Sequence, residues 1–164
     1  MGKKLVLVRH SKAFQPEIGQ TDHSRKLNPK GIERAGGVAV QLKALSIKPD
    51  CVLVSTSSRT RDTVAVFKPI LNISDHNISF LDSLYLTDTD DYMNAIRECP
   101  DSCQTVMIIG HNPTTAWLAN MLTNTHYSWA TGSAMVLDCS INSWLNFYQN
   151  SAKFNSYIDA KLIA

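Results

Sequence analysis

The sequence lacks several features that would place it in other classes of protein. Its 164 residues contain four cysteines and no long apolar run. The apolar run behind the two lysines near the start ends at Arg9, which is too short for a signal-peptide core or a membrane span. Leu5 and Val6 occupy the region where the myristoylation pattern beginning at Gly2 requires Ser or Thr. We therefore expect a cytoplasmic protein.

An excess of charge of one sign is also missing. The chain has 16 Lys and Arg against 14 Asp and Glu, which gives a formal net charge of +2. No basic run resembles a patch for nucleic acid or membrane, so we expect neither as a partner. The apolar fraction of 44% and the charged fraction of 18% are typical of a globular chain. The length and the absence of repeats or linkers predict one domain over residues 1–164.

The cysteines form no recognisable redox or metal motif. Cys51 and Cys139 lie in apolar, strand-like runs, where a buried free thiol is the expected state. Cys99 and Cys103 lack the spacing of a redox CxxC pair or a zinc knuckle, and no pair of histidines lies near them. We expect no metal site and no cofactor.

Short apolar runs alternate with longer amphipathic segments along the chain. Buried strands are expected at residues 4–8, 51–54, 78–80 and 105–109, with closing strands at 133–137 and 143–148. Helices are expected at 28–45, 59–71, 92–99 and 112–122, the first opened by Asn28 and Pro29. Gly36 and Gly37 inside the first helix suggest a close approach to the sheet. The alternation predicts a three-layer α/β/α sandwich with a mainly parallel central sheet.

Reactive side chains follow three of the expected strands. Arg9 and His10 follow the first, Arg59 lies shortly after the second, and His111 follows the strand at 105–109. Ligands of open α/β sheets bind beyond the carboxyl ends of the strands, so these side chains should converge. Guanidinium groups bind phosphoryl oxygens bidentately, and a neutral imidazole can attack phosphorus. The expected helix start at 112–113 adds partial positive charge. The pattern therefore favours phosphoryl transfer.

Four ordered segments of the chain resemble the histidine phosphatase superfamily, which has the phosphoglycerate mutase-like fold. The strand and Arg-His pair at 5–13 resemble its signature, 52–63 its second-arginine segment, and 108–113 its second-histidine segment. The stretch at 24–31 resembles the small branch typified by the phosphohistidine phosphatase SixA, as do 130–134 and Trp144. Order and spacing agree from residue 4 to about residue 148.

The resemblance implies a role for each reactive side chain. His10 would be the nucleophile and form a phosphohistidine intermediate. The phosphoryl oxygens would be held by Arg9, Arg59 and His111. Arg25 would contact the phosphate from its loop, and Ser11, which stands where the superfamily usually has Gly, would border the substrate.

Larger members of the superfamily also carry a Glu general acid near residues 81–85, and this sequence has none there. Expelling an alkoxide requires a proton donor, whereas imidazole, with a pKa near ~6.5, can leave neutral. The expected activity is therefore phosphohistidine hydrolysis on a protein such as a histidine phosphotransfer domain, with inorganic phosphate as product. A small-molecule phosphomonoesterase that uses Asp82 or Asp88 as acid remains the alternative.

Two further alternatives carry less support. A non-catalytic phosphoprotein-binding module would not need the nucleophile His10 beside His111. A zinc hydrolase would be expected to carry an HExxH-type pair, and the neighbouring arginines would repel the metal.

Overall fold

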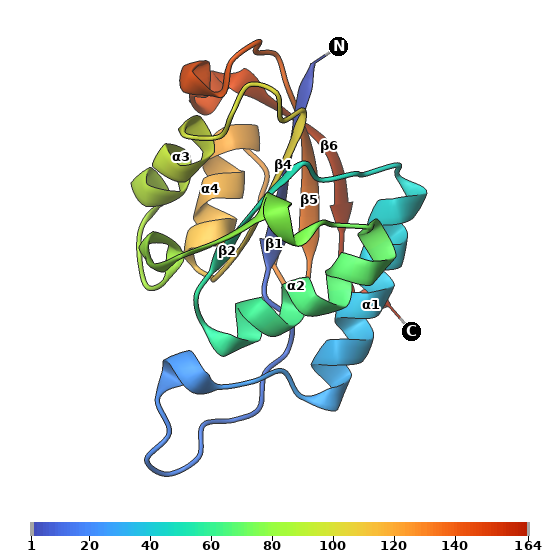
Figure 1. Ribbon diagram of the computed structural model, residues 1–164, viewed down its shortest axis with the longest axis vertical. Helices are drawn as coiled ribbons and strands as arrows, with labels where there is room; N and C mark the ends of the chain where they lie inside the picture. The colour runs from blue at the N-terminus through green and yellow to red at the C-terminus, as the bar shows by residue number, and fades with distance from the viewer. Residues whose placement is uncertain (1, 164) are drawn as a thin grey trace.

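The computed structural model describes residues 2–163 and places a six-stranded sheet between two layers of helices (Figure 1). The strands are β1 (Lys3–Arg9), β2 (Cys51–Ser55), β3 (Ile78–Leu81), β4 (Thr105–Gly110), β5 (Ala134–Cys139) and β6 (Ala152–Ile158). The helices are α1 (Pro29–Ala44), α2 (Ser58–Leu71), α3 (Thr89–Arg97) and α4 (Thr114–Thr123).

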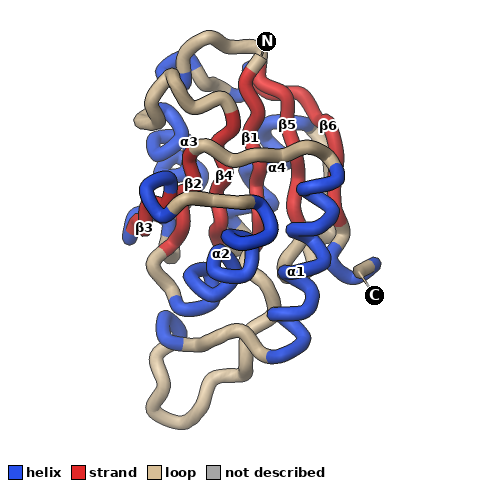
Figure 2. The backbone as a smooth tube through the Cα atoms, turned by 45° about the vertical axis from the view of Figure 1, so that its right-hand side comes forward, coloured by secondary structure: helices blue, strands red, loops and turns tan. Residues whose placement is uncertain are grey.

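The strand order is β3-β2-β4-β1-β5-β6, as Figure 2 shows from the side of α1 and α2. Neighbours among β3, β2, β4 and β1 pair in parallel, whereas β5 pairs antiparallel with β1, and β6 antiparallel with β5. The expected three-layer fold with a mainly parallel sheet is confirmed.

Alternate residues of the central strands pack on opposite faces of the sheet. Leu5 and Leu7 of β1 pack in the apolar cluster formed with α3 and α4. Val6 and Val8 pack in the second cluster, which includes α1 and α2. Successive side chains of a strand point to opposite faces, so an uninterrupted apolar run is what a strand covered on both faces requires.

Side-chain caps mark the starts of α1 and α2. The Asn28 side chain accepts a hydrogen bond from Gly31 N at 2.8 Å and so caps α1. Ser57 caps α2 by accepting from Thr60 N, which places Arg59 in the first helical turn. The cap at Asn28 agrees with the sequence expectation, whereas α4 begins at Thr114 rather than at residue 112.

The expected strand at 143–148 is wrong. Trp144–Asn146 form a 3₁₀ turn, and the closing strand is β6 instead. Trp144 and Phe147 are both fully buried, and a separation of three residues places side chains on one side of a 3₁₀ turn. β6 is an edge strand with few buried positions, so its apolar pattern is weak in the sequence.

Gly37 lies against the end of the chain rather than against the sheet. A Cβ at Gly37 would stand 2.1 Å from Cγ2 of Ile163, so only glycine admits the C-terminal segment there. Of the two glycines expected to approach the sheet, Gly37 therefore does make a close approach, but to the C-terminal segment and not to the sheet.

The carboxyl ends of β1, β2 and β4 meet at one edge of the sheet. Arg9 of β1 stands opposite Gly110 of β4, and β2 lies on the other side of β4. The loop between β1 and α1 extends beyond this edge (Figure 1). Within residues 2–163, no helix combines the length and the apolar character that crossing a bilayer requires.

Candidate active site

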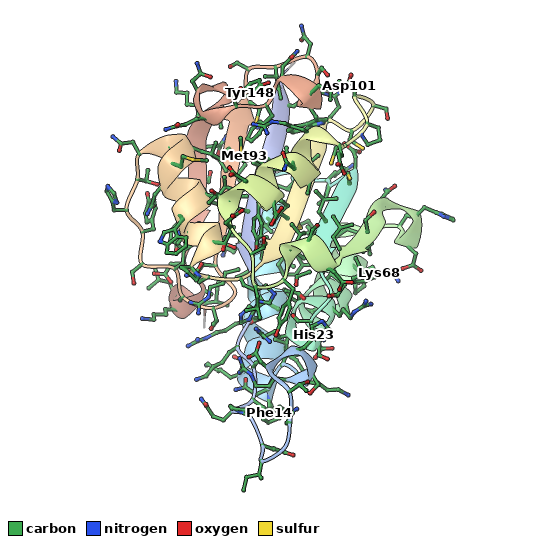
Figure 3. The ribbon with its side chains drawn as sticks, turned by 90° about the vertical axis from the view of Figure 1, so that its left-hand side faces the viewer. Phe14, His23, Lys68, Met93, Asp101 and Tyr148 are labelled. Atoms are coloured by element: carbon green, nitrogen blue, oxygen red, sulfur yellow. The ribbon has the colours of Figure 1, made fainter. Side chains whose placement is uncertain are left out.

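A cavity of about 390 Å³ opens at the carboxyl edge of the sheet. Its lining includes Arg9, His10, Arg25, Arg59, His111 and Asn112. His23 and Phe14 mark this end of the molecule in Figure 3. A larger cavity of about 710 Å³ surrounds Lys4 and Asp138 at the other end of the sheet, but no histidine or arginine lines it. The side chains expected to converge thus share the smaller cavity.

His10 is held as a neutral imidazole with one nitrogen directed at the arginines. Its Nδ1 lies 2.7 Å from the carbonyl oxygen of Ser11, so Nδ1 carries the hydrogen and donates it. Nε2 then keeps a lone pair and accepts from Arg59 Nε at 3.3 Å. Burial lowers the pKa of His10 to about 3, and the charges of Arg59 and Arg9 act in the same direction. The imidazole is therefore an unprotonated base at neutral pH.

His111 contacts the same guanidinium from the neighbouring strand. Arg59 Nη2 lies 3.3 Å from His111 Nδ1, and His111 Nε2 lies 2.8 Å from the Ser55 hydroxyl. Burial, followed by the charge of Arg59, lowers the pKa of His111 to about 4. The main-chain N–H of His111 donates to the Tyr92 hydroxyl at 3.0 Å. Gly110 is required beside it, because a Cβ there would stand 2.1 Å from that hydroxyl.

Arg9 offers an unused donor to an anion. Its Nη1 donates to the carbonyl oxygen of Trp129 at 2.5 Å. Among residues 2–163, no group accepts a hydrogen bond from its buried Nε. Burial also lowers the pKa of Arg9. A buried donor without an acceptor is costly, and an oxygen of a bound phosphoryl group would remove that cost.

Asp22 connects the loop before α1 to Arg59. Its Oδ2 accepts from Arg59 Nη2 at 2.9 Å and from the Tyr85 hydroxyl at 2.7 Å, and its carbonyl oxygen accepts from Arg59 Nη1 at 2.8 Å. Partial burial raises the pKa of the carboxyl, but the hydrogen bonds from Tyr85, Arg25 and Arg59 outweigh it. The pKa lies well below its usual range, so Asp22 is ionised.

Arg25 lines the cavity and is held there by protein groups. Its Nε and Nη2 donate to Asp22 Oδ1 at 3.1 and 2.8 Å, and its Nη1 donates to the carbonyl oxygen of Phe14 at 3.0 Å. These hydrogen bonds use part of the donor capacity of the guanidinium group. Sequence reasoning missed Asp22; the separation of three residues from Arg25 was the local signal available for it.

Ser11, which the resemblance places at the border of the substrate, is not among the side chains that line the cavity. Its side chain is fully buried, and its hydroxyl donates to the carbonyl oxygen of Gly31 at 2.6 Å. Its main-chain N–H donates to the Thr63 hydroxyl at 3.0 Å. The hydroxyl thus joins the start of α1 to the end of β1.

The two carboxylates considered as general acids lie elsewhere. Asp82 accepts a hydrogen bond from the Thr56 hydroxyl, and Asp88 caps α3 by accepting from the main chain of Asp90 and Asp91. Neither lines the cavity. His23 donates to or accepts from the same Thr56 hydroxyl at 3.0 Å, and its ring meets Tyr85 edge-on.

A second cavity of about 240 Å³ adjoins the first and shares Leu86, His111 and Asn112 with it. Leu86 is 77% exposed and has a φ of 49°, a conformation that a bulky residue rarely adopts. Trp117 also lines this cavity and is 57% exposed. Trp129, by contrast, is buried.

Residues 5–84 match the family model described as histidine phosphatase superfamily (branch 1). An uncharacterised protein of Mycobacterium tuberculosis is 34% identical over 115 residues, which cover 70% of this chain and 69% of the relative. The chain belongs to the histidine phosphatase superfamily. An uncharacterised chloroplastic protein of Arabidopsis thaliana is 28% identical over 153 residues, covering 88% of this chain and 70% of the relative.

Solved structures in the superfamily extend the similarity to nearly the whole chain. A protein assigned as phosphohistidine phosphatase SixA from Nakamurella multipartitia has 26% identity and a TM-score of 0.81, with 96% of each chain covered. A protein with the same assignment from Agrobacterium tumefaciens has 26% identity and a TM-score of 0.79, covering 96% of this chain and 98% of that one. The SixA-like resemblance is confirmed.

The fold by itself does not identify the substrate. A mycobacterial glucosyl-3-phosphoglycerate phosphatase shares it at 13% identity, with a TM-score of 0.67 and 94% and 97% of the two chains covered. Any choice between substrates must therefore come from the site.

Proposed function

We propose that this phosphatase hydrolyses phosphohistidine on a partner protein through a covalent intermediate on His10. One observation carries the proposal: the neutral imidazole of His10 directs Nε2 toward Arg59 Nε, 3.3 Å away, inside a cavity that Arg9 also lines. An unprotonated nitrogen nucleophile thus stands where guanidinium groups would bind a phosphoryl group.

The side chains around His10 suit two successive phosphoryl transfers, first to His10 and then to water. In the first, Nε2 of His10 forms a bond to phosphorus while the bond from phosphorus to the substrate imidazole breaks, and that imidazole leaves neutral after taking a proton from solvent. In the second, water attacks phosphorus, inorganic phosphate leaves and His10 returns to its neutral form. Arg9, Arg59 and His111 would hold the equatorial oxygens throughout.

The carboxylate that contacts Arg59 argues against stable phosphate esters. Asp22 is ionised, so it has no proton to give to a departing alkoxide. Asp82 and Asp88 are engaged outside the cavity. An imidazole needs far less help to leave than an alkoxide does. These contacts favour phosphohistidine over the alternative, a small-molecule phosphomonoesterase.

Apolar side chains beside the cavity suit a protein partner. Leu86 and Trp117 are exposed on one side, and Phe14 and Ile18 are exposed on the loop before α1. Exposed apolar groups beside a charged pocket are typical of a surface that meets another protein. The partner that we propose is a phosphohistidine-bearing protein such as a histidine phosphotransfer domain, and we place the reaction in the cytoplasm. The similarity to structures assigned as SixA supports the same substrate class.

The test compares kcat/KM for a phosphohistidine protein with kcat/KM for a set of phosphosugars and p-nitrophenyl phosphate. We expect the phosphohistidine protein to be preferred, and His10→Ala to abolish its turnover. If any phosphosugar wins by more than about tenfold, equivalent to ~1.4 kcal/mol in transition-state binding, the small-molecule alternative replaces this proposal.

A further inference from the structure

Two cysteine sulfurs are in contact far from the phosphate cavity. Cys51 is the first residue of β2, and Cys99 follows the end of α3. Their Sγ atoms lie 3.4 Å apart. They stand near the amino end of β2, whereas Ser55 at its carboxyl end contacts His111, which lines the candidate active site. In Figure 3, Asp101 marks the same end of the molecule, and His23 marks the other.

A small oxidant has access to this pair. A cavity of about 180 Å³ is lined by both cysteines together with Ser79, Ala95, Glu98 and Pro100. A water molecule takes up about 30 Å³ of liquid, so a peroxide, which has one more oxygen, fits within this space. Cys51 is half-buried and Cys99 is buried, so Cys51 is the more accessible of the two thiols.

The contact also shifts the pKa values of the two thiols in opposite directions. A hydrogen bond from the Cys99 thiol lowers the pKa of Cys51 to about 7, although burial opposes the change. The same hydrogen bond and burial raise the pKa of Cys99. Burial raises the pKa of Cys103 to about 11 and that of Cys139 to about 12. The thiolate is the reactive form of a cysteine. Because its pKa is lowered, Cys51 is the cysteine that we expect to react first with peroxide.

We propose that Cys51 and Cys99 form an intramolecular disulfide when the protein meets hydrogen peroxide, at a modification site separate from the phosphatase site. The Cys51 thiolate attacks one peroxide oxygen, the O–O bond breaks, and the released hydroxide becomes water, which leaves a sulfenic acid on Cys51. The Cys99 sulfur then attacks the Cys51 sulfur, the S–O bond breaks and a second water leaves. In total, two thiols and one peroxide give one disulfide and two waters.

The experiment treats the native full-length protein with hydrogen peroxide, quenches free thiols by alkylation and maps peptides without reduction. We expect one cross-link, between Cys51 and Cys99, a loss of the mass of two hydrogens, and reversal by dithiothreitol. The matched variant Cys139→Ser, which removes a buried cysteine elsewhere, should keep the cross-link, and Cys51→Ser should lose it. A thermal melt of each variant confirms that it is folded.

Two outcomes would overturn the proposal. One is a wild-type protein that stays fully reduced or stops at a sulfenic acid on Cys51. The other is a cross-link of Cys51 to Cys103 that survives in Cys99→Ser and dominates in the wild type. Measuring the rate of alkylation in the untreated protein gives a second readout that needs no variant: Cys51 should react faster than Cys103 and Cys139.

Discussion

Asp22 holds Arg59 through both of its terminal nitrogens. Its carboxylate accepts from Nη2 at 2.9 Å, and its main-chain oxygen accepts from Nη1 at 2.8 Å. The guanidinium is planar, so fixing these two nitrogens also fixes the direction of Nε, which faces His10 at 3.3 Å. A residue of the loop before α1 thus orients the arginine of α2 against His10, which follows β1.

Asp22→Ala should lower kcat by about 10- to 100-fold, the scale for a misplaced catalytic group. The depressed pKa of Asp22 shows that its ionised carboxylate stabilises the folded chain at neutral pH, so its loss should also lower the melting temperature. Steady-state kinetics with a thermal melt checks both expectations. Recovery of part of the rate in Asp22→Asn, whose amide oxygen can still accept from Arg59, would distinguish orientation from charge.

Asp82→Asn serves as the control for the carboxylate assignment. Asp82 is exposed, and among the contacts within residues 2–163 its carboxylate accepts a side-chain hydrogen bond only from the Thr56 hydroxyl. We expect its kcat to stay within about twofold of wild type, a free-energy change well below ~1.4 kcal/mol. A loss as large as that in Asp22→Ala would make Asp82 the acid and restore the phosphomonoesterase alternative.

Arg9→Lys and Arg59→Lys should each lower kcat by roughly 10²–10³-fold, the scale for loss of one preorganised donor. Lysine keeps the charge but not the planar fork, and at position 9 it cannot reproduce both Nε and Nη1. Arg61→Lys is the matched control, because Arg61 is exposed and contacts the Thr56 carbonyl and the Phe80 ring. Equal losses in all three variants would mean that the assay reports folding and not phosphate binding.

Most of the fold could be predicted because its strands and helix starts are local signals. The apolar runs of β1 and β4, and the cap at Asn28, are visible within a few residues of sequence. The segment around Trp144 was misread because two buried aromatic residues three apart resemble a short strand as easily as a turn. β6 was missed because a half-buried edge strand needs little apolar sequence.

In the candidate site, too, some residues could be predicted from the sequence and others depend on the tertiary fold. His10, Arg59 and His111 follow predicted strands, so the topology was enough to bring them together. The Tyr85 contact with Asp22 joins residues 63 positions apart, and no local pattern predicts it. The burial of Ser11 depends on where α1 begins to pack, since its hydroxyl meets the Gly31 carbonyl.

The stability of the protein should fall as the pH drops below about 6.5, the unperturbed pKa of histidine. Burial lowers the pKa of folded His10 to about 3 and that of His111 to about 4. Between these values and 6.5 the unfolded chain binds more protons, so acidification favours unfolding, and the full contribution returns above about pH 6.5. Melting temperatures across this window should depend less steeply on pH in His10→Gln; an unchanged slope would contradict the neutral state of folded His10.

Activity should survive dialysis against EDTA. Arg9 and Arg59 supply the positive charge around the phosphoryl group in this account, so no metal ion is needed for that role. The measurement is kcat before and after chelation, and again after Mg²⁺ or Zn²⁺ is added. A rate that collapses with EDTA and returns with either ion would contradict the arginine-based site.

Brief reaction with a ³²P-labelled phosphohistidine protein, followed by rapid quenching, tests the central claim most directly. His10 Nε2 accepts from Arg59 and is unprotonated, so it should receive the phosphoryl group. We expect acid-labile, base-stable label that peptide mapping places on His10, with no label in His10→Ala. Label on a Ser, Asp or Cys, or label that persists in His10→Ala, would contradict it.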